Sequence, residues 1–459
     1  MKKRLSEREL KHQSRRYSIA EGLFASVKTH VGDNFIQPFA IALNSSNAVV
    51  ALLTSVTGLL WPLSQSYGSK LMEKKPRKKI ILAISVLRIF FWISLITLAF
   101  LSYKNILSWV LPSLLLAFYG LYNFFAGIEY PSWFSWMGDL VDEKYRGRWF
   151  SKRNLLIGVA GACALVVASI FLDFLTNRNL ALIGFGILFF FAALARFFSM
   201  IFIKKQYEPK LKVEKKDYFS FWQFLKKAPK TNFGKFSLFR FSMAFSTTIS
   251  SSLLAVYLLR SLGFDYLIYM LITFGASFFS FFVLELWGKF SDKYGNYRIL
   301  IITTFFTPLI SLLWILFPSP IYLFLIPSMI SHVTTVGFNL ATNNFIYDNV
   351  KKEKRGPAIS YYNILQGLGV FLGSGLAAIL IQYLKTTWIE PIILIFLIST
   401  FVRMFVVAYW VPKLKEVRKT NKFKGMKSVE KLLKKELLPT INQEIHQMTS
   451  MGRYLHLRG

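Results

Sequence analysis

The sequence has little cysteine and few acidic residues. Its 459 residues include a single cysteine, Cys163, which excludes a disulfide within the chain and counts against a cysteine-ligated metal site. Only 17% of the residues are charged, against about 25% in an average soluble protein, whereas 54% are hydrophobic and 17% aromatic. This composition excludes a soluble enzyme, a disordered chain and a nucleic-acid-binding tail as descriptions of the whole protein.

Sequence motifs of catalysis and cofactor binding are also missing. No G-x-x-x-x-G-K-[ST] loop occurs, so ATP is not the direct energy source through such a loop. Histidine, cysteine and carboxylate residues do not cluster with zinc-ligand spacing, and no G-x-S-x-G nucleophile motif is present. We therefore expect a protein that is not an enzyme and that uses neither a cofactor nor a bound metal.

Long apolar runs dominate the chain. Runs of about 18 or more mostly apolar residues are typical of membrane-spanning helices. The sequence contains twelve, which predict an all-α integral membrane protein with twelve transmembrane helices in two six-helix, pseudo-symmetric halves. The predicted spans are residues 17–43, 48–72, 79–102, 107–137, 154–176, 180–203, 236–260, 264–289, 299–318, 320–347, 358–384 and 388–411. The predicted divisions are a basic tail (1–16), an N-terminal bundle (17–203), a linker with an amphipathic helix (204–235), a C-terminal bundle (236–411) and a second basic tail (412–459).

The positive charge is confined to one set of loops. The net charge is +33, from 56 Lys+Arg and 23 Asp+Glu. Both tails, the linker and alternate loops hold 47 of the 56 basic residues, and the intervening loops hold only Lys104, Arg178, Arg260 and Lys385. Because lysine and arginine accumulate in cytoplasmic loops, we expect a multi-pass plasma-membrane protein with both termini in the cytoplasm. This distribution explains the basic charge without a nucleic-acid partner.

The linker and the C-terminal tail each contain a short amphipathic pattern. In residues 217–227, the side chains of Tyr218, Phe221, Trp222 and Leu225 fall on one helical face, with lysines nearby. The tail segment 428–438 has a similar apolar face. Both patterns fit helices that lie in the inner membrane interface.

The two halves repeat one another. Residues 139–158 align with residues 348–367 at an offset of 209, and a weaker match relates residues 68–79 to residues 288–299. Parallel repeats of this kind are one known transporter design, with the ligand site at the interface between the halves. The identical positions are Asp139, Arg146, Gly147, Asn154 and Gly158 in the first half, and Asp348, Arg355, Gly356, Asn363 and Gly367 in the second.

The loop after the eighth span carries a family resemblance. Its sequence GKFSDKYGNYR (288–298) resembles the major facilitator superfamily motif G-x-x-x-D-[RK]-x-G-x-[RK]-x-[RK], with part of the spacing kept. The first-half copy departs from the motif, because Met72 stands where Asp292 would be. The resemblance implies a twelve-helix secondary transporter that exposes a central site alternately to each side of the membrane.

The same loops predict a cytoplasmic gate. Gly288 permits close helix approach, Asp292 suits a helix N-terminus, Gly295 supplies a turn and Arg298 offers a fork for carboxylates. The alternative is ordinary loop solvation combined with topology signals. The predicted gate residues are Asp139, Arg146, Gly147, Glu285, Gly288, Asp292, Gly295, Arg298, Asp348, Arg355 and Gly356.

The first span has a polar stripe at helical spacing. Charged side chains at membrane depth cost about 2.5–3.5 kcal/mol at the centre and usually face a cavity or a partner. Asp33 and His30 are three residues apart on this stripe and can touch, so either could exchange a proton. The alternative is that Asp33 pairs with an arginine to hold two helices together. The stripe comprises Ser26, His30, Asp33, Asn34, Gln37 and Asn44.

Other spans contribute weaker candidates. Glu129, near Pro131, could carry protons or brace a gate, and Pro131 could break its helix. His332, Asn339 and Asn343 give the tenth span a polar face that could bind a solute, or that could instead bond neighbouring helices. Possible counter-ions within the spans are Arg88, Arg196, Arg240 and Arg403.

These patterns favour a monomeric secondary transporter that moves a small solute by alternating access. A proton is the expected coupling ion, with sodium as the alternative, and the other partner is the lipid bilayer. One competing hypothesis is an efflux pump for hydrophobic compounds on the same fold. The other is a lipid-handling or sensory membrane protein without transport activity.

Overall fold

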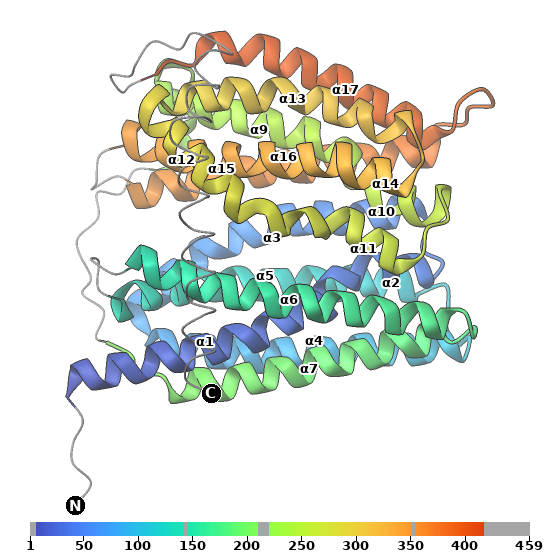
Figure 1. The fold of residues 1–459 in the computed structure, drawn as a ribbon, viewed down its shortest axis with the longest axis horizontal. Coiled ribbons are helices and arrows are strands. Elements are labelled where there is room, and N and C mark those ends of the chain that lie inside the picture. Colours follow the sequence, from blue (N-terminus) through green and yellow to red (C-terminus); the bar gives the residue numbers. More distant parts are fainter. Residues whose placement is uncertain (1–5, 142–145, 210–219, 351–354, 417–459) are drawn as a thin grey trace, which may run out of the picture.

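The computed structural model describes residues 6–141, 146–209, 220–350 and 355–416, although the side chains of residues 146–148, 278–279, 281–282 and 355–356 are excluded. In this part of the chain, helices run side by side along a common direction (Figure 1). Ten of them are long and apolar enough to cross a membrane. They are α3 (Asn47–Lys74), α4 (Arg77–Tyr103), α5 (Leu111–Leu140), α6 (Arg146–Thr176), α7 (Ala181–Lys205), α9 (Asn232–Ser251) continued by α10 (Leu254–Val256) and η4 (Tyr257–Ser261), α13 (Asn296–Leu316), α14 (Pro320–Leu323) continued by η6 (Phe324–Ser328) and α15 (Met329–Asn349), α16 (Arg355–Tyr383), and α17 (Pro391–Trp410) followed by η8 (Val411–Lys413).

Two further crossings are interrupted, which completes the predicted twelve. The first consists of α1 (Glu7–Val31), the 3₁₀ turn η1 (Asp33–Phe35) and α2 (Ile36–Ala42). The eighth consists of α11 (Tyr266–Phe274), the 3₁₀ turn η5 (Gly275–Phe279) and α12 (Ser280–Tyr294). A 3₁₀ turn inside a long helix often marks a hinge or a functional site.

The helices form two groups of six. Within the first group, α4 packs on α5 and α7, and α1 packs on α6 and α7; in the second group, α13 packs on α15 and α17. Figure 1 shows the first group, from blue to green, below the second group, from yellow to red. The halves meet mainly where α3 lies along α16 and where α6 meets α11.

The two ends of the bundle differ in charge. The end at which α3 stops at Lys74, α4 begins at Arg77 and α7 stops at Lys205 is here called the basic face. The other end, where α4 stops at Tyr103 and α17 begins at Pro391, is called the distal face. The basic face is the end that the charge pattern assigns to the cytoplasm.

The linker contains a short helix, as predicted, that packs on the second half. It is the short helix α8 (Phe221–Lys227), and it buries Phe224 against the second half, whereas Trp222 is 69% exposed. The ring of Tyr361 on α16 lies 5.5 Å from that of Phe221 and 5.8 Å from that of Phe224. Packing on α16 therefore buries Phe224, and contact of the exposed Trp222 with the inner membrane interface stays a prediction. Tyr218 and the tail segment 428–438 lie outside the described residues.

Candidate functional site

A buried charge network begins at the break in the first crossing. The chain leaves α1 at Val31, and the following turn brings Asp33 back toward the last part of α1. Asp33 Oδ2 accepts from Lys28 Nζ at 2.5 Å and from Thr29 Oγ1 at 3.1 Å. Its other oxygen, Oδ1, accepts from the Tyr122 hydroxyl on α5 at 2.7 Å. The turn thus places a carboxylate between its own helix and a neighbour.

The network continues through three more helices. Arg88 on α4 donates through Nη2 to the Tyr122 hydroxyl at 2.5 Å and through Nη1 to Glu129 Oε2 at 2.8 Å. Arg196 on α7 donates to Glu129 Oε1 at 2.5 Å and to Ser85 Oγ at 2.8 Å. Both arginines named as possible counter-ions in this half therefore pair with Glu129. Its helix α5 continues through Pro131, so the predicted break at that proline was wrong.

Four charged members of this network line a cavity of about 480 Å³ in the first half. Lys28, Arg88, Arg196 and Glu129 are on its wall, and the Glu21–Arg153 pair, 3.0 Å apart, lines its basic-face side. Ion pairs in a low-dielectric interior are stable only while each charge keeps its partner, and removal of one partner typically costs about 3–5 kcal/mol. A change in the charge of any one member therefore affects contacts among all four helices of the network, which are α1, α4, α5 and α7.

The structure does not bring His30 and Asp33 together. His30 Nδ1 bonds the Ser26 carbonyl oxygen at 2.9 Å, one turn back on α1, and faces the cavity wall. The expected contact required a continuous helix, and α1 ends between the two residues. Of the other stripe residues, Gln37 on α2 donates to Thr54 on α3 at 3.2 Å, and Asn34 lies beside Asp33 in the 3₁₀ turn.

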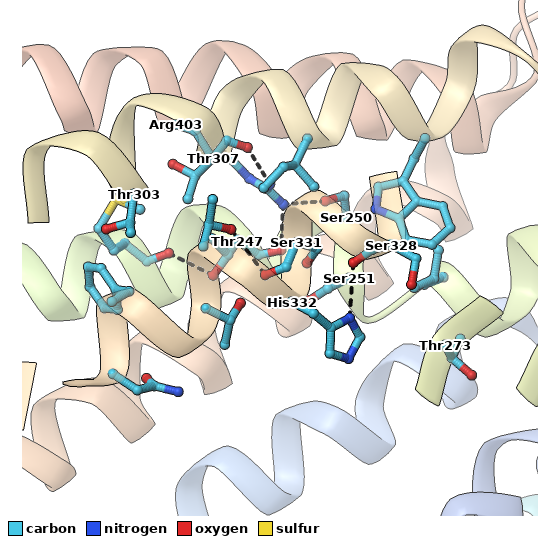
Figure 2. Close-up of a pocket in the computed structure, with 18 of the residues that line it drawn as sticks. Thr247, Ser250, Ser251, Thr273, Thr303, Thr307, Ser328, Ser331, His332 and Arg403 are labelled. Atoms are coloured by element: carbon cyan, nitrogen blue, oxygen red, sulfur yellow. Dashed lines mark hydrogen bonds between the residues drawn. The ribbon is translucent and has the colours of Figure 1, made fainter. Parts of the chain in front are cut away.

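The second half contains a separate cavity of about 330 Å³, and Figure 2 shows its polar lining. His332 and Asn339 of the predicted solute-binding face line it, whereas Asn343 is exposed and is not on its wall. His332 Nδ1 bonds the Ser328 carbonyl oxygen at 3.0 Å. Ten hydroxyl residues share this cavity: Thr247, Ser250, Ser251, Thr273, Thr303, Thr307, Ser328, Ser331, Thr334 and Thr335.

A third cavity, of about 310 Å³, lies where α3 meets α16. Its wall includes the amide side chains of Asn123, Asn363 and Gln366, together with Trp61. Trp61 also lines the cavity that contains the charge network. The charged cavity of the first half and the boundary between the halves therefore share one side chain.

At the basic face, one contact recurs in both halves. Arg77, the first residue of α4, donates to Asp139 near the end of α5 at 2.6 Å. Asn296, the first residue of α13, donates to Asp348 near the end of α15 at 2.9 Å. Asp139 and Asp348 are equivalent in the sequence repeat. Each repeat aspartate thus ties the start of the third helix of its half to the end of the fourth.

The predicted latch is only partly assembled. Gly295 has the expected turn conformation, with φ of 89°, a region that side-chain-bearing residues rarely adopt. Asp292 is exposed and has no ion pair with another described residue, and Glu285 pairs with Lys289 on its own helix at 2.8 Å. A Cβ added at Gly288 would meet open space, so no helix approaches it closely here.

For the remaining gate residues, the description is limited to their positions in the helices. Arg298 lies partly buried in the first turn of α13. Arg146 and Gly147 begin α6, and Arg355 and Gly356 begin α16, but these four side chains lie outside the described part.

The halves are joined tightly at the distal face. Asp173 near the end of α6 accepts from the backbone N–H groups of Tyr266 and Leu267, at 2.8 and 2.9 Å, and so caps the start of α11 across the boundary. Arg260 on η4 donates to the Ser45 carbonyl oxygen at 2.7 Å and to Asn47 Oδ1 at 2.5 Å. These bonds close the bundle at its distal end.

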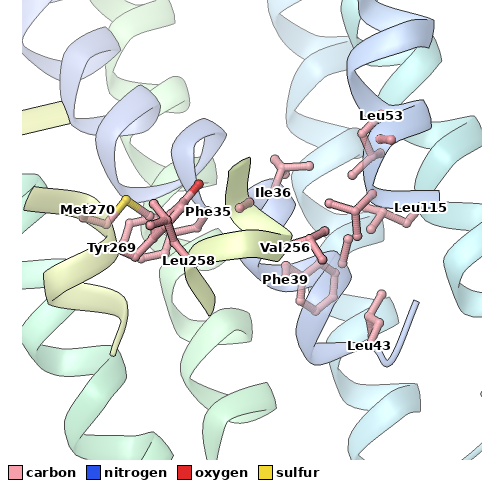
Figure 3. Close-up of a cluster of buried hydrophobic side chains, with 14 of the residues drawn as sticks. Phe35, Ile36, Phe39, Leu43, Leu53, Leu115, Val256, Leu258, Tyr269 and Met270 are labelled. Atoms are coloured by element: carbon pink, nitrogen blue, oxygen red, sulfur yellow. The ribbon is translucent and has the colours of Figure 1, made fainter. Parts of the chain in front are cut away.

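An apolar cluster lies beneath these polar contacts. Figure 3 shows side chains from both halves gathered there. Phe39 is fully buried, and the Phe185 and Tyr266 rings from opposite halves meet edge to face at 5.5 Å. The cluster excludes water from the distal end. Its labelled members are Phe35, Ile36, Phe39, Leu43, Leu53, Leu115, Val256, Leu258, Tyr269 and Met270.

The two-half arrangement of twelve membrane-crossing helices defines a transporter fold. The family model described as Major Facilitator Superfamily matches residues 22–240 and again residues 236–443. The chain belongs to the Major Facilitator Superfamily. It is accordingly a membrane transporter by family rather than an enzyme. Comparison with curated proteins finds no match.

Solved structures with the same fold include transporters for different solutes. A mutant of the nucleoside transporter NupG matches with a TM-score of 0.65 and 14% identity, over 88% of this chain and 100% of that one. A bacterial homologue of the iron transporter ferroportin, in an inward-facing state, matches with a TM-score of 0.63 and 14% identity, over 89% and 100%. A bacterial homologue of the human lysosomal transporter Spinster, inward-facing and unoccupied, matches with a TM-score of 0.59 and 16% identity, over 89% and 97%. At these identities the likeness shows the fold alone.

Proposed function

We propose that the protein is a secondary active transporter that moves a small polar solute by alternating access and is driven by protons. The observation that carries this proposal is the Lys28–Asp33 pair at the break in the first crossing, joined through Tyr122 to Arg88 and Glu129. A passive helical bundle gains little from burying so many charges, because each is costly in the membrane. A network in which charged groups can exchange hydrogen-bond partners can instead rearrange when one carboxylate takes up a proton.

Asp33 is the proposed proton-binding residue. A proton on Asp33 cancels its charge, which removes the attraction that holds Lys28 beside it. The turn around Asp33 is then free to change its angle relative to α1. Gly32 precedes this turn, and only glycine fits there, since a Cβ at that position would lie 2.5 Å from the Trp92 ring and 2.7 Å from Ala192. In this proposal His30 is a wall residue of the cavity and not a relay to Asp33.

The closed distal face supports the alternating part of the proposal. The described halves bond each other through Asp173 and Arg260 at the distal end, whereas Asp292 is exposed and the space beside Gly288 is open. This pattern is expected of a conformation that loads or releases solute at the basic face. We place that face on the cytoplasmic side of the plasma membrane. Asp292 would engage in the opposite conformation, when the basic face closes.

The charged and hydroxyl side chains in otherwise largely apolar walls favour a solute with polar groups over a hydrophobic drug. The first cavity is lined by charged groups and the second by hydroxyl groups, His332 and Asn339. Export of hydrophobic compounds would be expected to use a more apolar wall. Membership of a transporter family likewise disfavours a sensory or lipid-handling protein without transport.

Flux in liposomes tests the proposal. The purified full-length protein is screened with metabolite mixtures by thermal shift, and each stabilising solute is then supplied to liposomes that contain a pH-sensitive dye. Coupled transport acidifies or alkalinises the lumen only when solute is added, and Asp33→Asn abolishes this signal. Uptake that depends on sodium at fixed pH, with no proton signal, would refute proton coupling and leave transport itself intact.

A further inference from the structure

Arg403 in the last helix is a buried cation without a carboxylate partner among the described residues. Its side chain is 5% exposed. Nε donates to Ser399 Oγ at 3.1 Å, Nη1 to the Thr307 carbonyl oxygen at 2.8 Å, and Nη2 to the Thr247 carbonyl oxygen and Ser250 Oγ at 3.0 and 2.6 Å. All four acceptors are neutral, and Figure 2 shows Arg403 beside Thr307, Thr247 and Ser250. One of the five guanidinium N–H groups, on Nη1, remains unused.

In the first half of the protein, the arginine of the last helix has a carboxylate partner. Arg196 lies in the last helix of that half, 207 residues before Arg403, and it is neutralised by Glu129 at 2.5 Å. The offset of 209 that relates Asp139 to Asp348 places Phe338 at the position of Glu129. The equivalent helix of the second half therefore carries a neutral ring where the first half carries the counter-ion.

The space beside Arg403 is a cavity and not packed side chains. Phe338 lines the cavity of about 330 Å³ together with Arg403 and a second cation, Arg240. The Arg240 guanidinium carbon lies 4.7 Å from the Phe338 ring centroid, and its Nε is buried without a hydrogen-bond partner. Neither Asp nor Glu is among the described lining residues. Two cations thus face a space with many hydroxyl groups that contains no carboxylate of the described residues.

We propose that this cavity binds a small anion, whose negative charge takes the place that Glu129 has in the first half. A buried cation is stable in the membrane interior only when its charge is compensated, and neutral oxygens compensate it in part. Six of the ten lining hydroxyls donate to backbone carbonyls, whereas those of Ser251, Ser331 and Thr335 donate to no described group and can donate to an oxyanion or a carboxylate. Guanidinium groups bind both in charge-assisted bonds. The volume suits phosphate, sulfate or a small carboxylic acid, because it is at the small end of the roughly 300–1,000 Å³ usual for ligand pockets. This inference holds whichever ion drives transport.

Equilibrium binding to the detergent-purified full-length protein tests the site without any gradient. The probes are radiolabelled phosphate, sulfate, chloride and lactate, each added at constant ionic strength so that the basic surface is screened equally. We expect saturable binding of at least one probe at a stoichiometry of one. Phe338→Glu places a carboxylate of the protein beside Arg403 and Arg240, where it competes with the anion, and should weaken that binding roughly tenfold or more. Phe338→Gln has similar size without the charge and should bind the probe more tightly than Phe338→Glu, because the difference between the two variants is the carboxylate.

Two further outcomes decide the matter. Arg403→Gln, where it yields folded protein, should also lose the binding, and Phe338→Glu should melt at a higher temperature than Phe338→Gln in the absence of the probe. Equal binding by wild type, Phe338→Gln and Phe338→Glu would overturn the proposal and assign the anion to the basic surface. Absence of saturable binding by all four probes in the wild type would overturn it as well. A probe that binds and also exchanges across liposomes is a transported solute, and one that binds without exchange is a resident counter-ion; both support the site.

Discussion

Lys28 Nζ lies 2.5 Å from Asp33 Oδ2, across the point at which the first membrane crossing breaks. The two residues are five apart, a spacing at which an unbroken α-helix would direct their side chains to different faces. The 3₁₀ turn after Gly32 makes the pair possible, and the pair in turn stabilises the turn. Charge and backbone conformation at this position therefore depend on one another.

The first prediction concerns Asp33→Asn, which keeps the shape of the side chain and removes its charge. Proton-driven accumulation of solute should be lost, whereas exchange of solute down its gradient should continue. Lys28 would be left buried beside a neutral amide, so the variant should also be less stable, by up to about 3–5 kcal/mol. Liposome accumulation and exchange assays, with thermal unfolding of the same preparations, measure both effects.

A charge-matched double variant separates stability from coupling. Lys28→Gln combined with Asp33→Asn removes both charges and should recover much of the lost stability while transport remains uncoupled. Accumulation at the wild-type rate by Asp33→Asn under a proton gradient would instead show that Asp33 is only a structural charge.

The second prediction ranks two positions of the network. Glu129→Gln leaves Arg88 and Arg196 without their shared carboxylate and should destabilise the protein by about 3–5 kcal/mol. Tyr122→Phe removes one hydroxyl that bonds Asp33 and Arg88, and should cost about 1.5–3 kcal/mol. Thermal or denaturant unfolding in detergent gives the order. A Tyr122→Phe variant less stable than Glu129→Gln would show that the hydroxyl, and not the carboxylate, organises the network.

Much of the fold could be predicted from the sequence because membrane spans have a strong signal. Length and hydropathy located the twelve crossings, and the repeat located Asp139 and Asp348. The interruptions within the first and eighth crossings were not predicted. The first follows Gly32 and is stabilised by Lys28, a contact between residues at a spacing that helix periodicity does not pair.

The candidate site was predicted in part. Asp33, Glu129 and the possible counter-ions Arg88 and Arg196 were identified because ionisable residues are rare inside spans. Tyr122 was missed, since tyrosine is common in membrane helices and its hydroxyl partner lies on another span. Asp173 and Arg260 were missed as distal contacts, because contact across the two halves depends on tertiary arrangement.

The third prediction concerns topology. With Cys163 replaced by serine, single cysteines are introduced at Lys75, on the basic face, and at Lys104, on the distal face; both positions are exposed. A membrane-impermeant thiol reagent applied to intact cells should label the residue-104 variant and should label the residue-75 variant only after permeabilisation. Labelling of the residue-75 variant in intact cells would reverse the assignment of the basic face to the cytoplasm.

The fourth prediction concerns the contact that closes the distal face. Asp173→Asn removes the negative charge and one of the two acceptor oxygens that cap α11 from the other half. Loss of a charge at a helix N-terminus together with one hydrogen bond costs about 0.5–2 kcal/mol. The two hydrogen bonds exist only while the distal face is closed, so the substitution destabilises the closed conformation alone. The equilibrium between the closed and open distal face should shift toward the open one by roughly 2–30-fold.

Asp265 provides a matched control, because it precedes α11 directly and its side chain makes no capping bond. Spin labels on opposite halves at the distal face should report longer distances in Asp173→Asn and little change in Asp265→Asn. Equal distance distributions in the wild type and Asp173→Asn would show that the apolar cluster around Phe39, rather than the cap, keeps the distal face closed.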